Sequence, residues 1–171
     1  IGPMDFDEAA DQTTPFEWFD PRTRSEQGEE AGDIPWWAHW SFHDHPPLVF
    51  WIQHVSIGLF GENNFALRFP SAIFGIASVY LLYIVGSRWY SERVGLLSAL
   101  FLAVTLNHNY ISRLGMQEAY VIFFLLLGLY WFLRALEDGR WWLGVGAAVG
   151  LGFLAKYNTA ILAPIFLTYL A

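Results

Sequence analysis

The sequence contains no cysteine and little charge, and both shortages narrow the class of protein. Without cysteine, the chain has neither a disulfide scaffold nor a zinc site built on thiolates. Charged residues make up 15% of the 171 residues, whereas a typical soluble domain has about 25%. With nine lysines and arginines in total, no segment offers the basic face that would neutralise a phosphate backbone. The composition therefore argues against a nucleic-acid partner.

The charge that is present is concentrated near the N-terminus. Residues 1–44 contain eleven of the sixteen acids and two of the nine bases. The rest of the chain contains five acids and seven bases. This asymmetry predicts a polar, acidic first loop over residues 1–47, followed by a membrane-embedded part.

Five long apolar runs without charge follow this loop. A bilayer core requires about 20 mostly apolar helical residues, and about 17 suffice where flanking charges reach the interface. A soluble helical core is the alternative, but so short a chain leaves nothing to cover five such helices. We therefore predict an all-α polytopic membrane helix bundle, with five transmembrane helices within residues 69–171. The runs are residues 69–87, 94–112, 119–133, 141–155 and 157–171.

A shorter apolar run differs from these five. Residues 48–61 would span only about 21 Å as a helix, at about 1.5 Å per residue. The polar residues Gln53, His54 and Ser56 lie in its middle. We therefore predict an interfacial helix over residues 48–64, which lies on the membrane instead of crossing it.

If this segment does not cross, the order of the helices brings the unusual polar groups to one side of the membrane. The first loop, Arg113, Glu118 and Lys156 would then share that side. The two turns on the other side contain four arginines, which favours a cytoplasmic location for this other side. These arginines are Arg88, Arg93, Arg134 and Arg140.

Several of these residues are candidates for chemistry, each with a structural alternative. Asp7 and Glu8 could act as a general base at the membrane boundary, but in so acidic a loop a solvated role is the better reading from spacing alone. Glu118 could be functional or could complement the positive end of a helix. Lys156 could neutralise a lipid phosphate or anchor a helix end at the headgroups.

A histidine-rich segment before the double proline raises the question of a metal. His43, Asp44 and His45 are adjacent in sequence, so in an extended segment they cannot all point toward one ion. His39 is a fourth candidate ligand in the same region. The sequence therefore identifies no metal site, and binding of a divalent cation is left as an open alternative.

Four stretches and a short acidic motif resemble segments of a known family, and they follow one another in the same order as in that family. They are residues 45–51 (HPPLVFW), 59–75 (LFGENNFALRFPSAIFG), 112–119 (SRLGMQEA) and 151–157 (LGFLAKY), and the motif Asp7-Glu8-Ala9. They resemble the polytopic glycosyltransferases of the dolichyl-phosphate-mannose protein mannosyltransferase type. Bacterial lipid A aminoarabinose transferases are relatives of that type.

The resemblance implies a GT-C fold with an extracytoplasmic first loop and interfacial helices, in the plasma membrane of a prokaryote. It implies sugar transfer from a polyprenyl phosphate to an acceptor with inversion, and an N-terminal fragment of a longer enzyme. It places Asp7 and Glu8 at the catalytic position and Glu118 at the second acidic position. The sequence departs from the family at Ala10-Asp11, where aromatics are usual, and at Glu118, where aspartate is commoner.

The resulting hypothesis assigns a role to each candidate. Asp7 is the base, while Glu8 and Glu118 position the sugar or the acceptor or hold a divalent cation. The departing phosphate would be received by Lys156, Arg113 and His45. A transporter, with charges lining a path through the helices, is an alternative. A non-catalytic membrane protein that binds lipid is another.

Overall fold

The computed structural model describes residues 46–170 as helices joined by short connections. Within this range there is no strand, which confirms the predicted all-α membrane helix bundle. The helices are α3 (Leu48–Phe60), α4 (Asn64–Trp89), α5 (Glu92–Val104), α6 (Leu106–Arg113), α7 (Gln117–Glu137), α8 (Trp142–Ala155) and α9 (Leu162–Leu170), with the 3-10 turns η3 (Gly139–Trp141) and η4 (Tyr157–Ile161).

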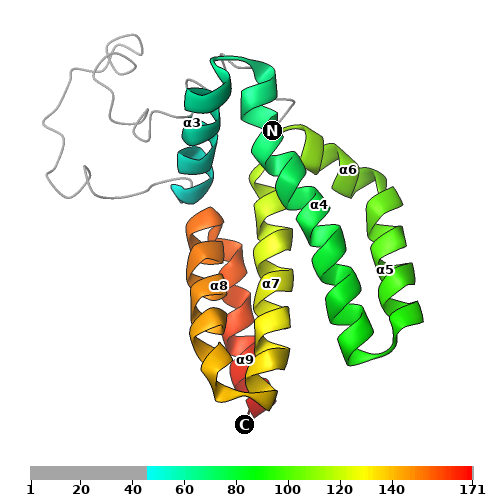
Figure 1. Cartoon of the computed structure of the whole chain (residues 1–171). Helices are drawn as coiled ribbons and strands as arrows, with labels where there is room; N and C mark the ends of the chain where they lie inside the picture. Colours follow the sequence, from blue (N-terminus) through cyan, green and yellow to red (C-terminus); the bar gives the residue numbers. More distant parts are fainter. Residues whose placement is uncertain (1–45, 171) are drawn as a thin grey trace, which may run out of the picture.

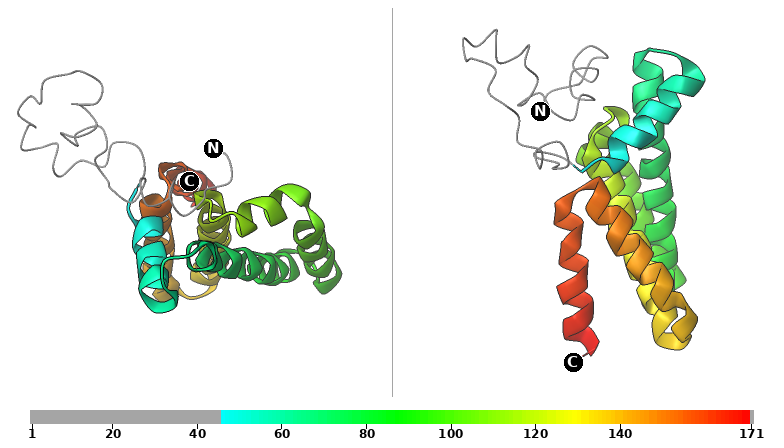
Figure 2. Two further views of the ribbon diagram at one scale, coloured as in Figure 1. Left: turned by 90° about the horizontal axis from the view of Figure 1, so that it is seen from above. Right: turned by 90° about the vertical axis from the view of Figure 1, so that its left-hand side faces the viewer.

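Helices α4 and α7 form the centre of the bundle and pack against each other (Figure 1). Helices α5 and α6 flank α4 on one side, while α8 and α9 lie along α7 on the other. The view from above shows the same order, with α3 near the end of α8 (Figure 2). Because successive long helices alternate in direction, the chain returns repeatedly to the end where α3 lies.

Among residues 46–170, two helices are long and apolar enough to cross a membrane, namely α4 with 26 residues and α7 with 21. The bent pair of α5 and α6 makes a third if it counts as one span. Helix α8 has 14 residues, and the apolar segment Tyr157–Leu170 is likewise shorter than the two long helices. Crossing by these two shorter segments stays a prediction.

The run expected as one straight span over residues 94–112 is divided at Thr105, where α5 and α6 meet at 61°. Polar side chains replace the helical hydrogen bonds at this break. The Thr105 hydroxyl donates to the carbonyl of Phe101 at 2.6 Å, and the Asn109 amide donates to that of Ala103 at 2.8 Å. The bend therefore follows from the polar residues in the middle of an otherwise apolar run.

A tight turn links α3 to α4. Gly61 has φ +81° and ends α3, with its N–H donating to the carbonyl of Ile57 at 2.8 Å. The side chain of Asn63 accepts from the Ala66 N–H at 2.9 Å, which caps the start of α4. The Asn63 amide also donates to the carbonyl of Phe60 at 2.8 Å. One side chain therefore ties the end of α3 to the start of α4.

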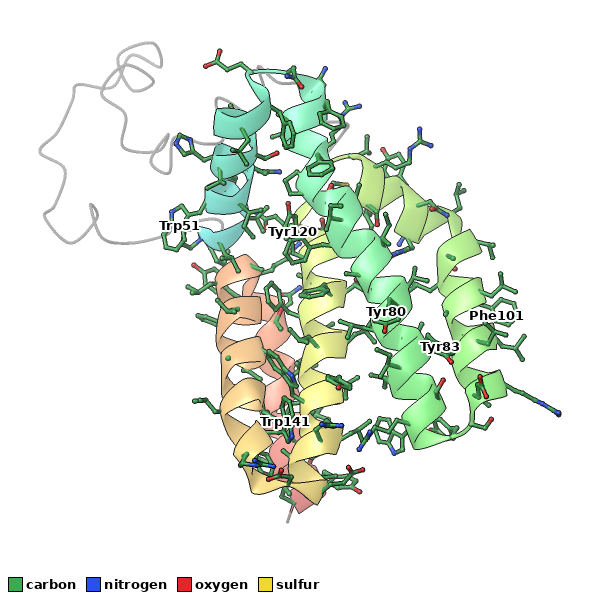
Figure 3. The ribbon with its side chains drawn as sticks, viewed as in Figure 1. Trp51, Tyr80, Tyr83, Phe101, Tyr120 and Trp141 are labelled. Atoms are coloured by element: carbon green, nitrogen blue, oxygen red, sulfur yellow. The ribbon has the colours of Figure 1, made fainter. Side chains whose placement is uncertain are left out.

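Helix α3 buries polar residues and exposes apolar ones, which is the opposite of the usual pattern on the surface of a soluble protein. It buries the polar residues Gln53 and Ser56. It exposes Trp51, Val55 and Leu59 by 57%, 61% and 74%, and Figure 3 shows Trp51 on the side of α3 that faces away from the bundle. An apolar exposed face suits contact with lipid. This burial pattern favours the predicted interfacial position of α3.

Two core clusters lie along α7. One contains Tyr120 and Phe124 of α7 together with Val49 of α3 and Ala155 of α8. The other joins α7 to α8 and α9, with the rings of Phe132 and Phe166 stacked at a centroid distance of 4.2 Å. The first of these clusters supports the end of the bundle to which α3 docks.

The close approach of α8 to its neighbours depends on Gly152. A Cβ atom there would overlap Thr159 and lie 3.0 Å from the Cβ of Phe124, whereas Gly150 faces open space. We expect Gly152→Ala to destabilise the fold by about 1–3 kcal/mol through overpacking. Gly150→Ala is the matched control and should be neutral or slightly stabilising, since alanine favours helix. Thermal unfolding in detergent measures both, and an equal response of the two variants would contradict this packing.

Candidate functional site

One end of the bundle gathers the ends of several helices. The first turns of α4 and α7, the end of α6 and the end of α8 lie there, next to α3 (Figure 1). Arg113 is the last residue of α6, Glu118 is in the first turn of α7, and Lys156 directly follows α8. The structure thus places these three residues at the same end of the bundle, as the order of the helices predicts.

Glu118 and Lys156 form an ion pair across two helices. The Lys156 Nζ atom donates to Glu118 Oε1 at 2.6 Å, and the two residues are 38 positions apart in sequence. Their side chains are only 27% and 39% exposed, for Lys156 and Glu118 respectively. In such partly buried surroundings a charge interaction is stronger than in water. This pair brings two of the predicted site residues into direct contact.

The backbone places each partner. Lys156 is extended (φ −162°, ψ 135°), and its N–H donates to the carbonyl of Gly152 at 2.8 Å, so the side chain leaves the end of α8 at a defined point. Its carbonyl accepts from the Thr159 N–H at 3.1 Å, which starts η4. Glu118 lies where the positive end of the α7 dipole favours a carboxylate. The dipole of α7 and the ammonium group of Lys156 therefore both stabilise the Glu118 carboxylate.

Buried polar atoms lie close in sequence to both partners. Tyr120 and Thr159 are fully buried, and neither hydroxyl has a hydrogen-bond partner among residues 46–170. The Gln117 Oε1 atom is also buried and has no hydrogen-bond partner within this range. Tyr120 packs on Phe74 at a ring distance of 4.5 Å, and Figure 3 shows it on α7 near the level where α8 ends. Sequence reasoning missed these residues because nothing in an apolar run marks which hydroxyl is buried.

The remaining predicted residues are placed differently. Arg113 is exposed at the end of α6. Asp7, Glu8 and His45 lie outside the described residues, as do His39, His43 and Asp44. Within residues 46–170 no group of three or more histidine or acidic residues could hold a metal ion. The catalytic and metal-binding roles therefore stay predictions.

Ion pairs also form at the opposite end of the bundle. Arg88 pairs with Glu137, and Arg140 donates to Asp138 at 2.6 Å. Hydrogen bonds from Arg140 lower the pKa of the Asp138 carboxyl. Since that pKa is lowered, the pair contributes stability above the ordinary pKa of aspartate, and the contribution is lost as the pH falls through the lowered value. The first pair joins the end of α4 to the end of α7, and the second lies in the turn between α7 and α8.

The charges of the described helices thus lie toward helix ends. A transporter was expected to place charged groups near helix centres, along a path. Helices α8 and α9 have no charged residue, and the charges of α5, α6 and α7 lie in their first or last turns. This distribution favours chemistry at the membrane boundary over passage through the bundle.

The fold, the long apolar helices and the terminal charges define a multi-pass membrane protein. A family model described as dolichyl-phosphate-mannose-protein mannosyltransferase matches residues 44–171. The chain therefore belongs to this family, which confirms the resemblance seen in the sequence.

Bacterial relatives support the same family. YycA of Bacillus subtilis (strain 168), named as a candidate mannosyltransferase, is 33% identical over 74% of this chain and 19% of its own length. The undecaprenyl phosphate-alpha-4-amino-4-deoxy-L-arabinose arabinosyl transferase 1 of Pseudomonas fluorescens (strain Pf-5) is 32% identical over 72% of this chain and 24% of its own length. The undecaprenyl phosphate-alpha-4-amino-4-deoxy-L-arabinose arabinosyl transferase 2 of Sodalis glossinidius (strain morsitans) is 26% identical over 79% of this chain and 26% of its own length.

The chain thus spans about a fifth to a quarter of the length of these curated relatives. No solved structure matches it.

The ion pair makes a stability prediction. Lys156→Met removes the cation that pairs with the Glu118 carboxylate, and we expect a loss of about 1–3 kcal/mol. The double variant with Glu118→Gln should recover most of this loss, because the carboxylate that paired with Lys156 is then replaced by a neutral amide. Arg140→Gln, which breaks an exposed pair, is the control and should cost less than about 1 kcal/mol. Thermal unfolding in detergent provides the comparison, and strictly additive losses at Glu118 and Lys156 would contradict the coupling.

Proposed function

We propose that this chain is part of a membrane glycosyltransferase, which moves a sugar from a polyprenyl-phosphate donor to a protein, lipid or glycan acceptor with inversion. The Glu118–Lys156 pair carries this proposal, since it places an acid and a base together at one end of a membrane bundle. Family membership supports the reaction class. The names of the relatives support a hexosyl or pentosyl transfer.

The reaction requires a base and a set of cations. The acceptor hydroxyl attacks the anomeric carbon and transfers its proton to Asp7, while the bond from that carbon to the phosphate oxygen breaks. The leaving group changes from a singly charged diester to a monoester with one more negative charge. Cations that face the departing oxygen therefore stabilise the transition state more than the ground state.

Lys156 is the cation best placed for this role. Its ammonium group already binds a carboxylate oxygen, and a phosphate oxygen offers the same kind of acceptor. In our proposal the donor phosphate takes the place of Glu118 on Lys156. Glu118 then turns to the sugar, to the acceptor or to a divalent cation. Arg113 adds positive charge at the same end, and His45 is a further candidate cation from the sequence.

The proposed orientation places this end of the bundle outside the cytoplasm. Four arginines lie at or near the turns of the opposite end, which fits a cytoplasmic side. The donor would reach the site by lateral diffusion in the membrane, because its polyprenyl chain partitions into the bilayer. The first loop would then reach the donor from the extracytoplasmic face.

The role of the base is tested with Asp7→Asn in the full-length protein, supplied with polyprenyl-phosphate sugars. We expect kcat to fall by about 10²–10⁴-fold, the usual contribution of a positioned base. Asp20→Asn changes another acid of the same loop and is the matched control, which should retain activity. Transfer by Asp7→Asn at the wild-type rate would remove Asp7 from this role.

The role of the cation is tested with Lys156→Gln in the same assay. Loss of positive charge beside the departing phosphate should lower kcat by about 10²-fold or more. Arg134→Gln changes a cation at the opposite end, where the guanidinium lies 4.8 Å from the Trp141 ring, and should leave transfer unchanged. An equal effect of the two variants would indicate a general effect on the membrane fold and would refute the proposed phosphate site.

A further inference from the structure

Gln53 is a buried polar residue on the inner side of α3. It is only 4% exposed, and its Nε2 atom donates to the carbonyl of Gly115 at 2.9 Å. The two residues are 62 positions apart, so this bond joins distant parts of the chain. A buried side-chain amide is costly unless it is paired, so the bond is a strong constraint on how α3 docks.

Gly115 lies in the turn that leads to Glu118. It has φ +80°, in the left-handed region that favours glycine. An added Cβ atom would lie 3.4 Å from the carbonyl oxygen of Leu67 and 3.5 Å from Gln53 Nε2. The turn is therefore held closely between α3 and α4.

The start of α7 depends on this turn. Its N-cap residue, Met116, makes no side-chain capping bond. The carbonyl of Ser112, just before the turn, accepts from the Ser71 hydroxyl of α4 at 3.0 Å. The direction in which α7 begins is thus set by hydrogen bonds from α3 and α4, and Glu118 lies in that first turn.

We propose that Gln53 is a positioning residue, which holds the turn at Gly115 so that Glu118 meets Lys156 with the correct geometry. This inference rests on the function proposed above for Glu118. The hydrogen bond thus ties α3 to the turn that precedes the second acidic residue.

Ser56 provides a matched control in the same helix. It is 5% exposed, and its hydroxyl donates to the carbonyl of Ala66 in α4 at 2.6 Å. This bond holds α3 on α4 and does not involve the Gly115 turn. Ser56→Ala therefore removes one bond between α3 and α4 but retains the contact that holds α3 to the turn before Glu118.

A double-mutant cycle in the full-length enzyme tests the coupling. Gln53→Met retains the side-chain volume but removes the donor, and we expect kcat/KM to fall about tenfold in the wild-type background. In the Glu118→Gln background the same change should have an effect of less than about twofold, because the position of Glu118 no longer matters. Ser56→Ala should be additive with Glu118→Gln.

Gln53→Asn, which is one methylene too short to reach Gly115, is the second variant and should behave like Gln53→Met. Effects of either Gln53 variant that are additive with Glu118→Gln would overturn the proposal.

A distance measurement tests the same inference without transferase activity. Spin labels on cysteines introduced at His54 and Met116 report the separation of α3 from the turn. Gln53→Met should broaden this distance distribution, whereas Ser56→Ala should leave it unchanged. An unchanged distribution in Gln53→Met would overturn the positioning role. A broadened distribution in a protein that transfers no sugar would refute the proposed function alone.

Discussion

The absence of water from the hydrocarbon core of a bilayer is the constraint on which this structure depends. Backbone groups must be paired within helices there, and charges are expensive unless they reach the boundary. The described helices obey this rule, since their charged residues lie toward their ends. Between helices, side chains bind backbone carbonyls, as Ser71 does at Ser112 and His108 at Gly75. Charged groups are therefore confined to the two ends of the bundle.

This confinement explains how residues distant in sequence come to share a site. Helices α7 and α8 are antiparallel neighbours, so the start of one lies beside the end of the other. Glu118 and Lys156 occupy those two positions and meet at 2.6 Å. At the boundary their attraction is stronger than in water, yet both side chains remain partly accessible. A resident carboxylate on an accessible lysine is a suitable ground state for exchange with a phosphate.

Much of this arrangement could be predicted from the sequence, because charge-free runs and their order define helices and sides. The all-α fold and the shared end for Arg113, Glu118 and Lys156 follow from that reasoning alone. The contact between Glu118 and Lys156 could not be predicted, since it depends on which helices pack together. The bend at Thr105 was missed because a count of charges treats threonine and asparagine as neutral, although their side chains compete for backbone hydrogen bonds.

Helix α3 connects the membrane with the proposed site, because one of its faces is apolar and exposed while the other bonds to the turn before Glu118. A helix that exposes Trp51, Val55 and Leu59 would be unfavourable in water, so contact with lipid favours its position. Its opposite face carries Gln53, which binds the turn before Glu118. If lipid contact orients α3, then the position of Glu118 depends on the same bilayer from which the proposed polyprenyl-phosphate donor would come. The physical state of the membrane would thereby influence the proposed reaction through one hydrogen bond, made by a helix that contains no aspartate, glutamate, lysine or arginine.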